Sequence, residues 1–305
     1  MFGEDCMNQK EKIEHSIITK YRKKIWRPFM KAVRDFELIQ EHDKIAVCIS
    51  GGKDSMLLAK CLEELQKHGN VSFDLVYLVM DPGYQSVNRK QIEKNLEILG
   101  ISATIFESNI FHVAEKSSKT RNDNPCYLCA RMRRGALYSK AKELGCNKIA
   151  LGHHFNDVIE TVLLNLIWNG QFSSMMPKLH STNFEGMELI RPLYYVKEQD
   201  IIYWANYHQL KFIDCACSVT KKGIGKRALI KQFVQELLEL YPKADINLLN
   251  ATKNVNLNTL LGWEDESKHS FLDHYDEKKM PSLTVSLFCD KIPLTGKRGC
   301  YYEIK

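Results

Sequence analysis

The chain has 305 residues, of which 44% are hydrophobic and 26% charged, proportions that are typical of a folded globular protein and exclude a chain that is disordered throughout. No apolar run approaches the roughly 20 residues needed to cross a bilayer, and the first residues carry no apolar signal core, so we expect a cytoplasmic protein that does not bind membranes. Lysine and arginine exceed aspartate and glutamate by 43 − 37 = 6, an excess that permits an anionic partner but serves solubility equally well.

Residues 1–40 contain a basic segment in which the apolar residues predict helices from about residue 11 onward. An alternation of strands and helices follows. Short, nearly continuous apolar runs predict strands buried on both faces at 44–49, 74–80, 101–107 and 148–151. Apolar residues at helical spacing predict helices at 56–68, 88–99, 131–144 and from about 157.

Strands that alternate with helices imply right-handed crossovers and therefore an α/β fold with a doubly wound, mostly parallel sheet. A strand-like run at 188–193 brings the expected number of strands to five. Further helical runs follow near 198–208, 227–240 and 245–258. We therefore expect three parts, which are a basic helical segment at 1–40, an α/β domain at 41–215, and a helical extension with a tail at 216–305.

A glycine-rich loop connects the first predicted strand to the helix after it. Two glycines let a backbone approach a phosphate closely, hydroxyls donate hydrogen bonds, and a helix start supplies free N–H groups. The spacing differs from that of the Walker loop, and an ordinary tight turn is the alternative. Because strand, loop and helix follow one another directly, we predict an anion-binding loop. Its residues are Ser50, Gly51, Gly52, Lys53, Asp54 and Ser55.

Ten cysteines in a chain without an export signal do not suggest a disulfide scaffold, so paired cysteines are candidate metal ligands or redox groups. Cys126 and Cys129 form a C-x-x-C pair, and Cys215 with Cys217 is the other close pair. Four thiolates would hold a structural zinc, three would hold an iron–sulfur cluster with one iron free, and two would form a redox pair. The spacing favours the open cluster and leaves the other two as alternatives.

Two further groups of residues are candidates for the edge of the sheet at which the glycine-rich loop is expected. Three arginines follow the C-x-x-C pair, at positions 131, 133 and 134, and they form either a solvated helix face or a phosphate-binding group. The segment from Gly152 to Asp157 follows the fourth predicted strand, so it should face the glycine-rich loop. Its two histidines and its aspartate could suggest zinc, but neighbouring histidines in a strand-to-helix turn usually diverge, and Asp157 is well placed as a helix N-cap.

The sequence Ser-Gly-Gly-x-Asp-Ser at 50–55 resembles the pyrophosphate loop of the N-type ATP pyrophosphatases. Further motifs occur in order along residues 20–260, namely PCYLCARMRRG, ALGHHFND, IRPL and DCAC. Their ordered combination resembles the tRNA 2-thiocytidine synthetase family, which belongs to those pyrophosphatases. The resemblance implies an adenine nucleotide alpha hydrolase-like fold and an enzyme that splits ATP into AMP and pyrophosphate.

This family resemblance implies a tRNA thiolase. The C2 oxygen of a tRNA cytidine, at position 32 of the anticodon loop, would be adenylated and then replaced by sulfur. The loop at 50–55 would hold the leaving pyrophosphate with Mg²⁺, with Asp54 on the magnesium side. By the same resemblance Arg133 would place a cation near the phosphates, and Gly152 and Asp157 would complete the nucleotide site. The expected catalytic residues are therefore Asp54, Arg133 and Asp157.

In the family, the C-x-x-C pair and a third cysteine hold a [4Fe–4S] cluster, which here implies Cys126, Cys129 and Cys215. The resemblance also implies a cysteine desulfurase as the sulfur source and leaves a homodimer open. The chain departs from the family pattern at three places: C-A-C stands at the third-cysteine site, Asn156 replaces an aspartate, and residues 80–84 match poorly.

Two other functions are compatible with these motifs. A tRNA 2-thiouridine synthetase would carry out the same adenylation, with sulfur from a cluster or from a persulfide on Cys126 or Cys129. A non-enzymatic RNA-binding protein would keep the glycine-rich loop as an ordinary turn. Pyrophosphate release that depends on tRNA would separate both enzymes from the RNA-binding protein.

Overall fold

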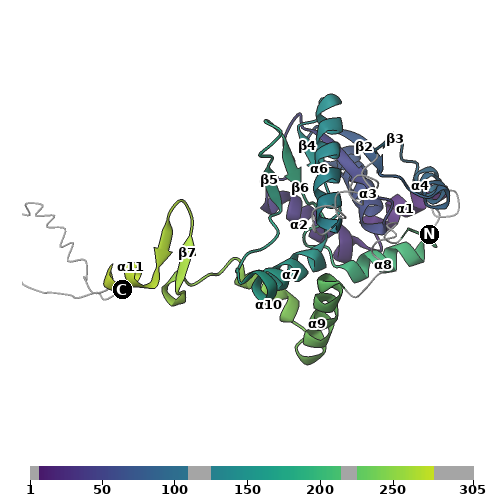
Figure 1. Ribbon diagram of the computed structural model, residues 1–305. Helices are drawn as coiled ribbons and strands as arrows, with labels where there is room; N and C mark the ends of the chain where they lie inside the picture. The colour runs from purple at the N-terminus through teal and green to yellow at the C-terminus, as the bar shows by residue number, and fades with distance from the viewer. Residues whose placement is uncertain (1–6, 109–124, 214–224, 278–305) are drawn as a thin grey trace, which may run out of the picture. The chain divides into compact units, whose positions relative to one another are not determined.

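The computed structural model describes residues 7–108, 125–213 and 225–277, with side chains for all of these except 125–130, 274, 276 and 277 (Figure 1). The chain divides into two compact units, Met1–Lys253 and Asn254–Lys305. The boundaries expected near residues 40 and 215 both fall within the first unit. Within the described ranges, no helix is long and apolar enough to cross a membrane.

The N-terminal basic segment is helical, as expected. It comprises α1 (Gln9–Ile18), a π-helix at Arg22–Trp26 and α2 (Arg27–Asp35). Four of its fully buried apolar side chains belong to the main core of the first unit, namely Ile13, Ile17, Ile25 and Phe29. Its basic side chains at 22, 23, 24 and 27 are exposed. The segment is therefore packed into the core and presents a basic outer face.

A six-stranded sheet forms the centre of the first unit, in the order β3-β2-β1-β4-β6-β5. The strands are β1 (Lys44–Ile49), β2 (Asp74–Asp81), β3 (Ala103–Glu107), β4 (Lys148–Ala150), β5 (Lys178–His180) and β6 (Glu188–Ile190). The first four pairings are parallel, which confirms the doubly wound α/β fold, and β5 pairs with β6 antiparallel. Sequence reasoning expected five strands and missed β5, because a three-residue edge strand is too short to produce a periodic pattern.

Helices cover both faces of this sheet. They are α3 (Lys53–His68), α4 (Ser86–Leu99), α6 (Pro125–Glu143), α7 (Phe155–Leu164) with a π-helical turn at Asn165–Asn169, and α8 (Glu198–Tyr207). Two further helices, α9 (Lys226–Leu240) and α10 (Ala244–Ala251), pack on α7. Successive residues of β1 face opposite layers. Ile45, Val47 and Ile49 pack in the core that contains α3 and α4. Ala46 and Cys48 pack in a separate core with α6. The apolar run of β1 is thus explained by burial on both sides.

Two helices differ in extent from the expectation. Helix α6 begins at Pro125, six residues before the expected start, because the six residues PCYLCA include no polar position and so show no helical spacing of apolar residues. Helix α10 ends at Ala251, seven residues before the expected end.

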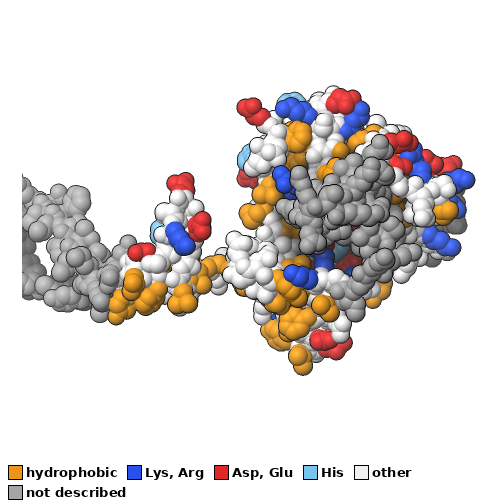
Figure 2. All heavy atoms as spheres, viewed as in Figure 1, with side chains coloured by type: hydrophobic (Ala, Val, Ile, Leu, Met, Phe, Trp, Pro, Cys, Tyr) orange, Lys and Arg blue, Asp and Glu red, His pale blue; other side chains and the backbone are white. Residues whose placement is uncertain are grey.

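Apolar side chains gather over α9 in Figure 2. Those of Leu229, Phe233 and Leu240 are exposed.

The second unit is small. It contains a 3₁₀ turn at Leu257–Thr259, the antiparallel strands β7 (Gly262–Glu264) and β8 (Lys268–Ser270), and α11 (Phe271–Glu277). The rings of Trp263 and His269, which are paired across the two strands, stack with centroids 4.7 Å apart.

Candidate active site

The glycine-rich loop lies at the carboxyl end of β1 and is closed by Ser55. Ser55 Oγ accepts a hydrogen bond from the backbone N–H of Ser50 (3.1 Å) and donates one to the carbonyl oxygen of Gly52 (3.0 Å). Gly51 has a φ of +86°, and a Cβ built on it would lie 2.7 Å from Ile92 of α4. Both the positive φ and the close contact require glycine at this position, so the loop depends on its serine and its glycine together.

The loop between β4 and α7 passes directly over the start of α3. A Cβ built on Gly152 would lie 2.9 Å from the backbone nitrogen of Ser55 and 3.0 Å from the carbonyl carbon of Asp54. Because β1 and β4 are parallel neighbours, their carboxyl ends meet at one edge of the sheet. The predicted meeting of the two motifs is therefore confirmed, and Gly152 permits their close packing.

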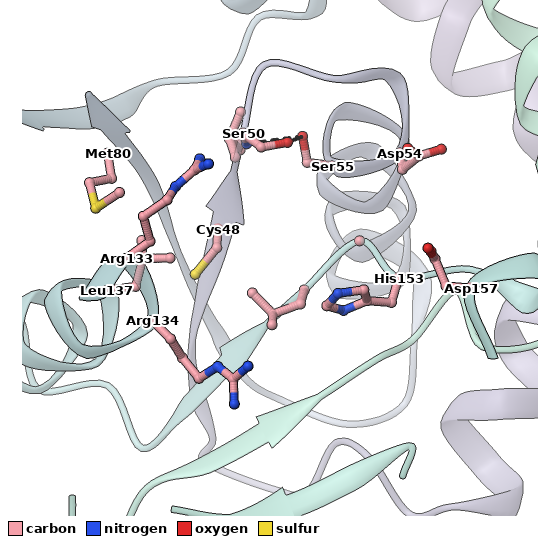
Figure 3. A pocket seen from close by; sticks show the side chains of 13 residues that line it. Cys48, Ser50, Asp54, Ser55, Met80, Arg133, Arg134, Leu137, His153 and Asp157 are labelled. Atoms are coloured by element: carbon pink, nitrogen blue, oxygen red, sulfur yellow. Dashed lines mark hydrogen bonds between the residues drawn. The ribbon is translucent and has the colours of Figure 1, made fainter. Parts of the chain in front are cut away.

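A cavity of about 390 Å³ lies between these two loops and α6 (Figure 3). The expected site residues that line it are Ser50, Asp54, Ser55, Arg133, Gly152 and Asp157. The expected loop residues that do not line it are Gly51, Gly52 and Lys53. Figure 3 shows Arg133 and Arg134 of α6 on one side of the cavity and Asp54 and Asp157 on the other. The cavity can therefore offer cations to phosphates from one wall and carboxylates to a metal ion from the other.

Asp54 has a carboxylate oxygen without a hydrogen bond. Its Oδ1 is buried and accepts none from any described residue, although Lys53 Nζ lies 3.2 Å and His154 Nε2 3.8 Å away. Burial raises the pKa of Asp54, and the charges of His154 and Lys53 oppose that shift. Such an oxygen beside a phosphate-sized cavity fits a hard cation such as Mg²⁺. No group of three or more described His, Cys, Asp or Glu side chains could hold a metal alone, so phosphate oxygens would have to complete the coordination.

Lys53 does not line this cavity but lines a neighbouring hollow with charged side chains. Its Nζ lies 3.1 Å from Glu198 of α8, and Glu198 lies 2.6 Å from Lys231 of α9. Burial alone would raise the pKa of Glu198, but Lys231 and Lys53 outweigh it and lower that pKa to about 2. Lys53 is therefore held by a charged carboxylate from another element.

Asp157 is the third residue of α7, and the interpretation of it as the N-cap is wrong. The N-cap is His154, whose N–H donates to Asp157 Oδ2 (2.9 Å) and whose Nδ1 accepts from the Asp157 N–H (3.4 Å). Arg227 of α9 donates to Asp157 Oδ1 (2.9 Å) and to Glu160 (2.8 Å). Asp157 thus links the start of α7 to the start of α9 beside the cavity.

Sequence reasoning did not anticipate the pair formed by His153 and Arg191. Arg191 Nε donates to His153 Nδ1 (3.3 Å). Burial and the charge of Arg191 lower the pKa of His153 to about 4, so this cavity-lining histidine is neutral at pH 7. Burial and the charge of Arg134 lower the pKa of Arg191 to about 10, which leaves it charged. The available signal was an arginine within an apolar stretch, because buried arginines usually serve a nearby polar group.

The expected cluster cysteines lie at the edge of what the structure describes. Cys126 and Cys129 belong to the first turns of α6, but their side chains are outside the described residues, as is the whole of Cys215. The last described residue before Cys215 is Ile213, whose Cδ1 would lie 2.8 Å from a Cβ built on Gly51. The chain therefore enters the segment that contains Cys215 from a position beside the glycine-rich loop.

Comparisons with known proteins identify the family. A model described as a PP-loop domain matches residues 19–237. A tRNA-cytidine(32) 2-sulfurtransferase from Geobacter metallireducens is 38% identical over 77% of this chain and 90% of that protein, and one from Alcanivorax borkumensis is 36% identical over 78% and 83%. The solved structure of the U34-tRNA thiolase NcsA from Methanococcus maripaludis, with its [4Fe-4S] cluster, has a TM-score of 0.60 and 23% identity, over 76% of this chain and 78% of that one.

The structural likeness shows a shared fold, and the sequence matches extend over most of both chains. Together they confirm the resemblance that the ordered motifs indicated. The chain belongs to the PP-loop proteins and, within them, to the tRNA-cytidine(32) 2-sulfurtransferase family.

Proposed function

We propose that this protein is an ATP-dependent tRNA thiolase that converts cytidine 32 of the anticodon loop to 2-thiocytidine. The proposal rests on the cavity between the two loops and α6, in a chain that belongs to this family. It combines a glycine-rich loop closed by Ser55, a buried carboxylate oxygen on Asp54 and a cation on Arg133 at the opposite wall. These groups match the needs of adenylation, in which the phosphates of ATP must be held and their charge balanced.

In the proposed reaction, the C2 oxygen of the cytidine attacks the α-phosphorus of ATP and pyrophosphate leaves. Negative charge grows on the departing oxygens, so the surrounding residues must supply hydrogen-bond donors and cations. The N–H groups of the loop and of the first turn of α3 are the donors, and Arg133 is the cation from the other wall. AMP is then bound to C2 through the original oxygen, and it leaves when sulfur attacks that carbon.

Asp54 would hold Mg²⁺ together with the phosphates of ATP. The ion neutralises phosphate charge and so favours the departure of pyrophosphate. Asp54→Ala removes the buried carboxylate, and Asp54→Asn keeps its shape but removes its charge. We expect both variants to fold and to lose tRNA-dependent pyrophosphate release. Wild-type turnover in the asparagine variant would show that the charge of this side chain is not needed and would contradict the assignment.

We further propose that Cys126, Cys129 and Cys215 hold a [4Fe–4S] cluster. Three thiolates suit such a cluster and leave one iron free, and the chemistry that it would supply is a bound sulfide. Ile213, the last described residue before Cys215, lies beside the glycine-rich loop, which supports a cluster close to the nucleotide site. Delivery of sulfur to C2 requires this proximity.

Four single variants purified without oxygen test the cluster. We expect Cys126→Ser, Cys129→Ser and Cys215→Ser each to lose iron, sulfide and thiolation, whereas Cys217→Ser retains most of all three. Stoichiometric zinc without sulfide, with all four cysteines required, would contradict the cluster and support a closed structural site. If Cys217→Ser loses iron and Cys215→Ser does not, the third ligand is Cys217 instead of Cys215.

Two alternatives are distinguished by the same measurements. A persulfide mechanism would retain thiolation without iron and would need an activated thiol on Cys126 or Cys129. Cys48 also lines the cavity, but burial and the nearby Cys146 raise the pKa of its thiol to about 12, which makes it a poor nucleophile. A 2-thiouridine synthetase would modify uridine, and a non-enzymatic RNA-binding protein would release no pyrophosphate.

The sulfur source that we propose is a cysteine desulfurase, because ATP supplies activation but no sulfur. A cytoplasmic location follows from the proposed tRNA substrate and fits the free cysteines at 48, 61 and 146, which are typical of a reducing compartment. Sedimentation of the purified protein decides between a monomer and the homodimer that the family resemblance leaves open.

A further inference from the structure

A second cavity, of about 550 Å³, lies between α6 and the hairpin formed by β5 and β6. We call it the hairpin cavity. We propose that it binds a phosphodiester of the tRNA strand next to the nucleotide that is modified. This inference rests on the proposed function, because it takes tRNA as the substrate, and it identifies a surface that contacts the strand outside the ATP site.

The hairpin cavity is cationic. Arg131 and Arg134 of α6 line one wall, and His180 lines the other. Among the described residues, no acidic side chain lines it and neither arginine forms an ion pair with an acidic residue. Both arginines are exposed, so their guanidinium groups remain available. Exposed guanidinium groups favour a phosphate, which they can bind through two hydrogen bonds.

The wall opposite the arginines is held in place by contacts with α6. The ring of Phe184 stacks on that of Tyr138, with centroids 5.1 Å apart and an interplanar angle of 10°. Ser181 Oγ accepts a hydrogen bond from the Phe184 N–H (3.1 Å), and Lys142 of α6 donates to the carbonyl oxygen of Glu185 (3.3 Å). The hairpin is therefore fixed on α6 before any ligand arrives, which reduces the entropy lost on binding.

The exposed tip of this wall carries Thr182 and Asn183, which line the cavity and face solvent. Hydroxyl and amide groups donate hydrogen bonds to phosphate and sugar oxygens in many nucleic-acid interfaces. The cavity thus combines cations on α6 with neutral donors on the hairpin.

Arg134 connects the hairpin cavity to the ATP site, because it lines both cavities. The triphosphate of ATP has its own loop at residues 50–55, on the side of the first cavity opposite α6. An anion that contacts Arg131 while the ATP phosphates occupy the loop would have to extend past Arg134 over both cavities. A polynucleotide meets this requirement, because its target base has to reach the α-phosphate while its neighbouring phosphates continue along the strand.

The first test compares Arg131→Ala with Lys140→Ala. Both remove one positive charge from α6, but Arg131 lines the hairpin cavity and Lys140 pairs with Glu143 at 2.6 Å. A lost contact to single-stranded phosphate reduces the magnitude of the negative slope of log K against log salt by about 0.7, which at 0.15 M salt corresponds to about fourfold weaker binding. We expect this change in slope and affinity for tRNA in Arg131→Ala and neither in Lys140→Ala.

The second test places a charge on the hairpin. Thr182→Glu should weaken tRNA binding several-fold by repelling the phosphate, whereas the neutral Thr182→Gln should bind as the wild type does. ATP affinity measured without tRNA should be unchanged in all four variants, because the loop at 50–55 is untouched. Weaker binding of ATP but not of tRNA would assign the cavity to nucleotide phosphate and overturn the inference.

The two proposals fail in different ways. In one outcome, the wild-type protein binds tRNA and forms 2-thiocytidine while Arg131→Ala matches Lys140→Ala in tRNA affinity and salt slope. This result would overturn only the proposed role of the hairpin cavity. A wild-type protein that neither binds nor modifies tRNA would overturn the proposed function and this inference with it. Melting temperatures equal to that of the wild type confirm that the surface variants are folded.

Discussion

Replacing Gly152 by alanine tests whether the active site depends on the close packing of two loops. The added Cβ would lie 2.9 Å from the backbone nitrogen of Ser55, and ordinary contacts begin at 3.4 Å, so the loops must separate by about 0.5 Å. The three nearest atoms all belong to the backbone of Asp54 and Ser55 and cannot rotate away. Overpacking of this kind destabilises a protein by about 1–3 kcal/mol.

The same displacement should reduce activity. Misplacing reacting groups by about 1 Å lowers rates about 100-fold, so a shift of about 0.5 Å should lower kcat/KM for ATP about 10-fold. The lost stability should lower Tm by about 2–10 °C. Pyrophosphate release in the presence of tRNA measures the first effect, and thermal unfolding measures the second.

Gly135→Ala is the matched control, because it makes the same chemical change on α6 where a Cβ would meet no atom of a described residue within 4 Å. Alanine is favoured over glycine inside a helix by about 1 kcal/mol, so this variant should be more stable and should bind ATP as the wild type does. Wild-type kcat/KM in Gly152→Ala, or an equal loss of ATP affinity in both variants, would refute the packing argument.

Three further predictions concern individual side chains. Ser55→Ala removes the hydroxyl that closes the glycine-rich loop, and we expect it to abolish thiolation while circular dichroism shows a retained fold; normal turnover would remove this loop from the mechanism. Replacing the exposed Lys23, Lys24 and Arg27 by alanine should weaken tRNA binding and flatten its salt dependence, and unchanged binding would make the segment an ordinary solvated face. Burial and the charge of a nearby lysine lower the pKa of His208 to about 4 from 6.5, so the unfolded chain binds more protons between these values. The free energy of unfolding should therefore fall as pH drops from about 6.5 to 4. Denaturant titrations should show a smaller fall in His208→Asn than in the wild type. An identical pH dependence in the two proteins would show that the histidine is not buried in its neutral form.

Local patterns predicted the part of the site that the chain builds from adjacent residues. The run from β1 through the glycine-rich loop into α3 could be predicted because burial on two faces, a glycine at positive φ and a helical stripe each produce a short-range pattern. The meeting of that loop with Gly152 could also be predicted, because parallel neighbouring strands end at one edge of the sheet.

Contacts between distant residues could not be predicted in this way. Lys53 pairs with Glu198, and Arg227 pairs with Asp157, across 145 and 70 positions of the chain. Such ion pairs depend on how helices pack and leave no local pattern. The cap of α7 is different, because the spacing of His154 and Asp157 is that of a capping box and was present in the sequence. It was missed because histidine is an uncommon N-cap.

The most direct test of the proposed function is the nucleoside content of tRNA after reaction. Unmodified tRNA is incubated without oxygen with the purified protein, ATP, Mg²⁺, cysteine and a cysteine desulfurase, and the nucleosides are identified by mass spectrometry while AMP and pyrophosphate are measured in parallel. We expect 2-thiocytidine at position 32, with one AMP and one pyrophosphate for each sulfur introduced. The appearance of 2-thiouridine instead, or tRNA binding without any thionucleoside or pyrophosphate, would contradict the assignment.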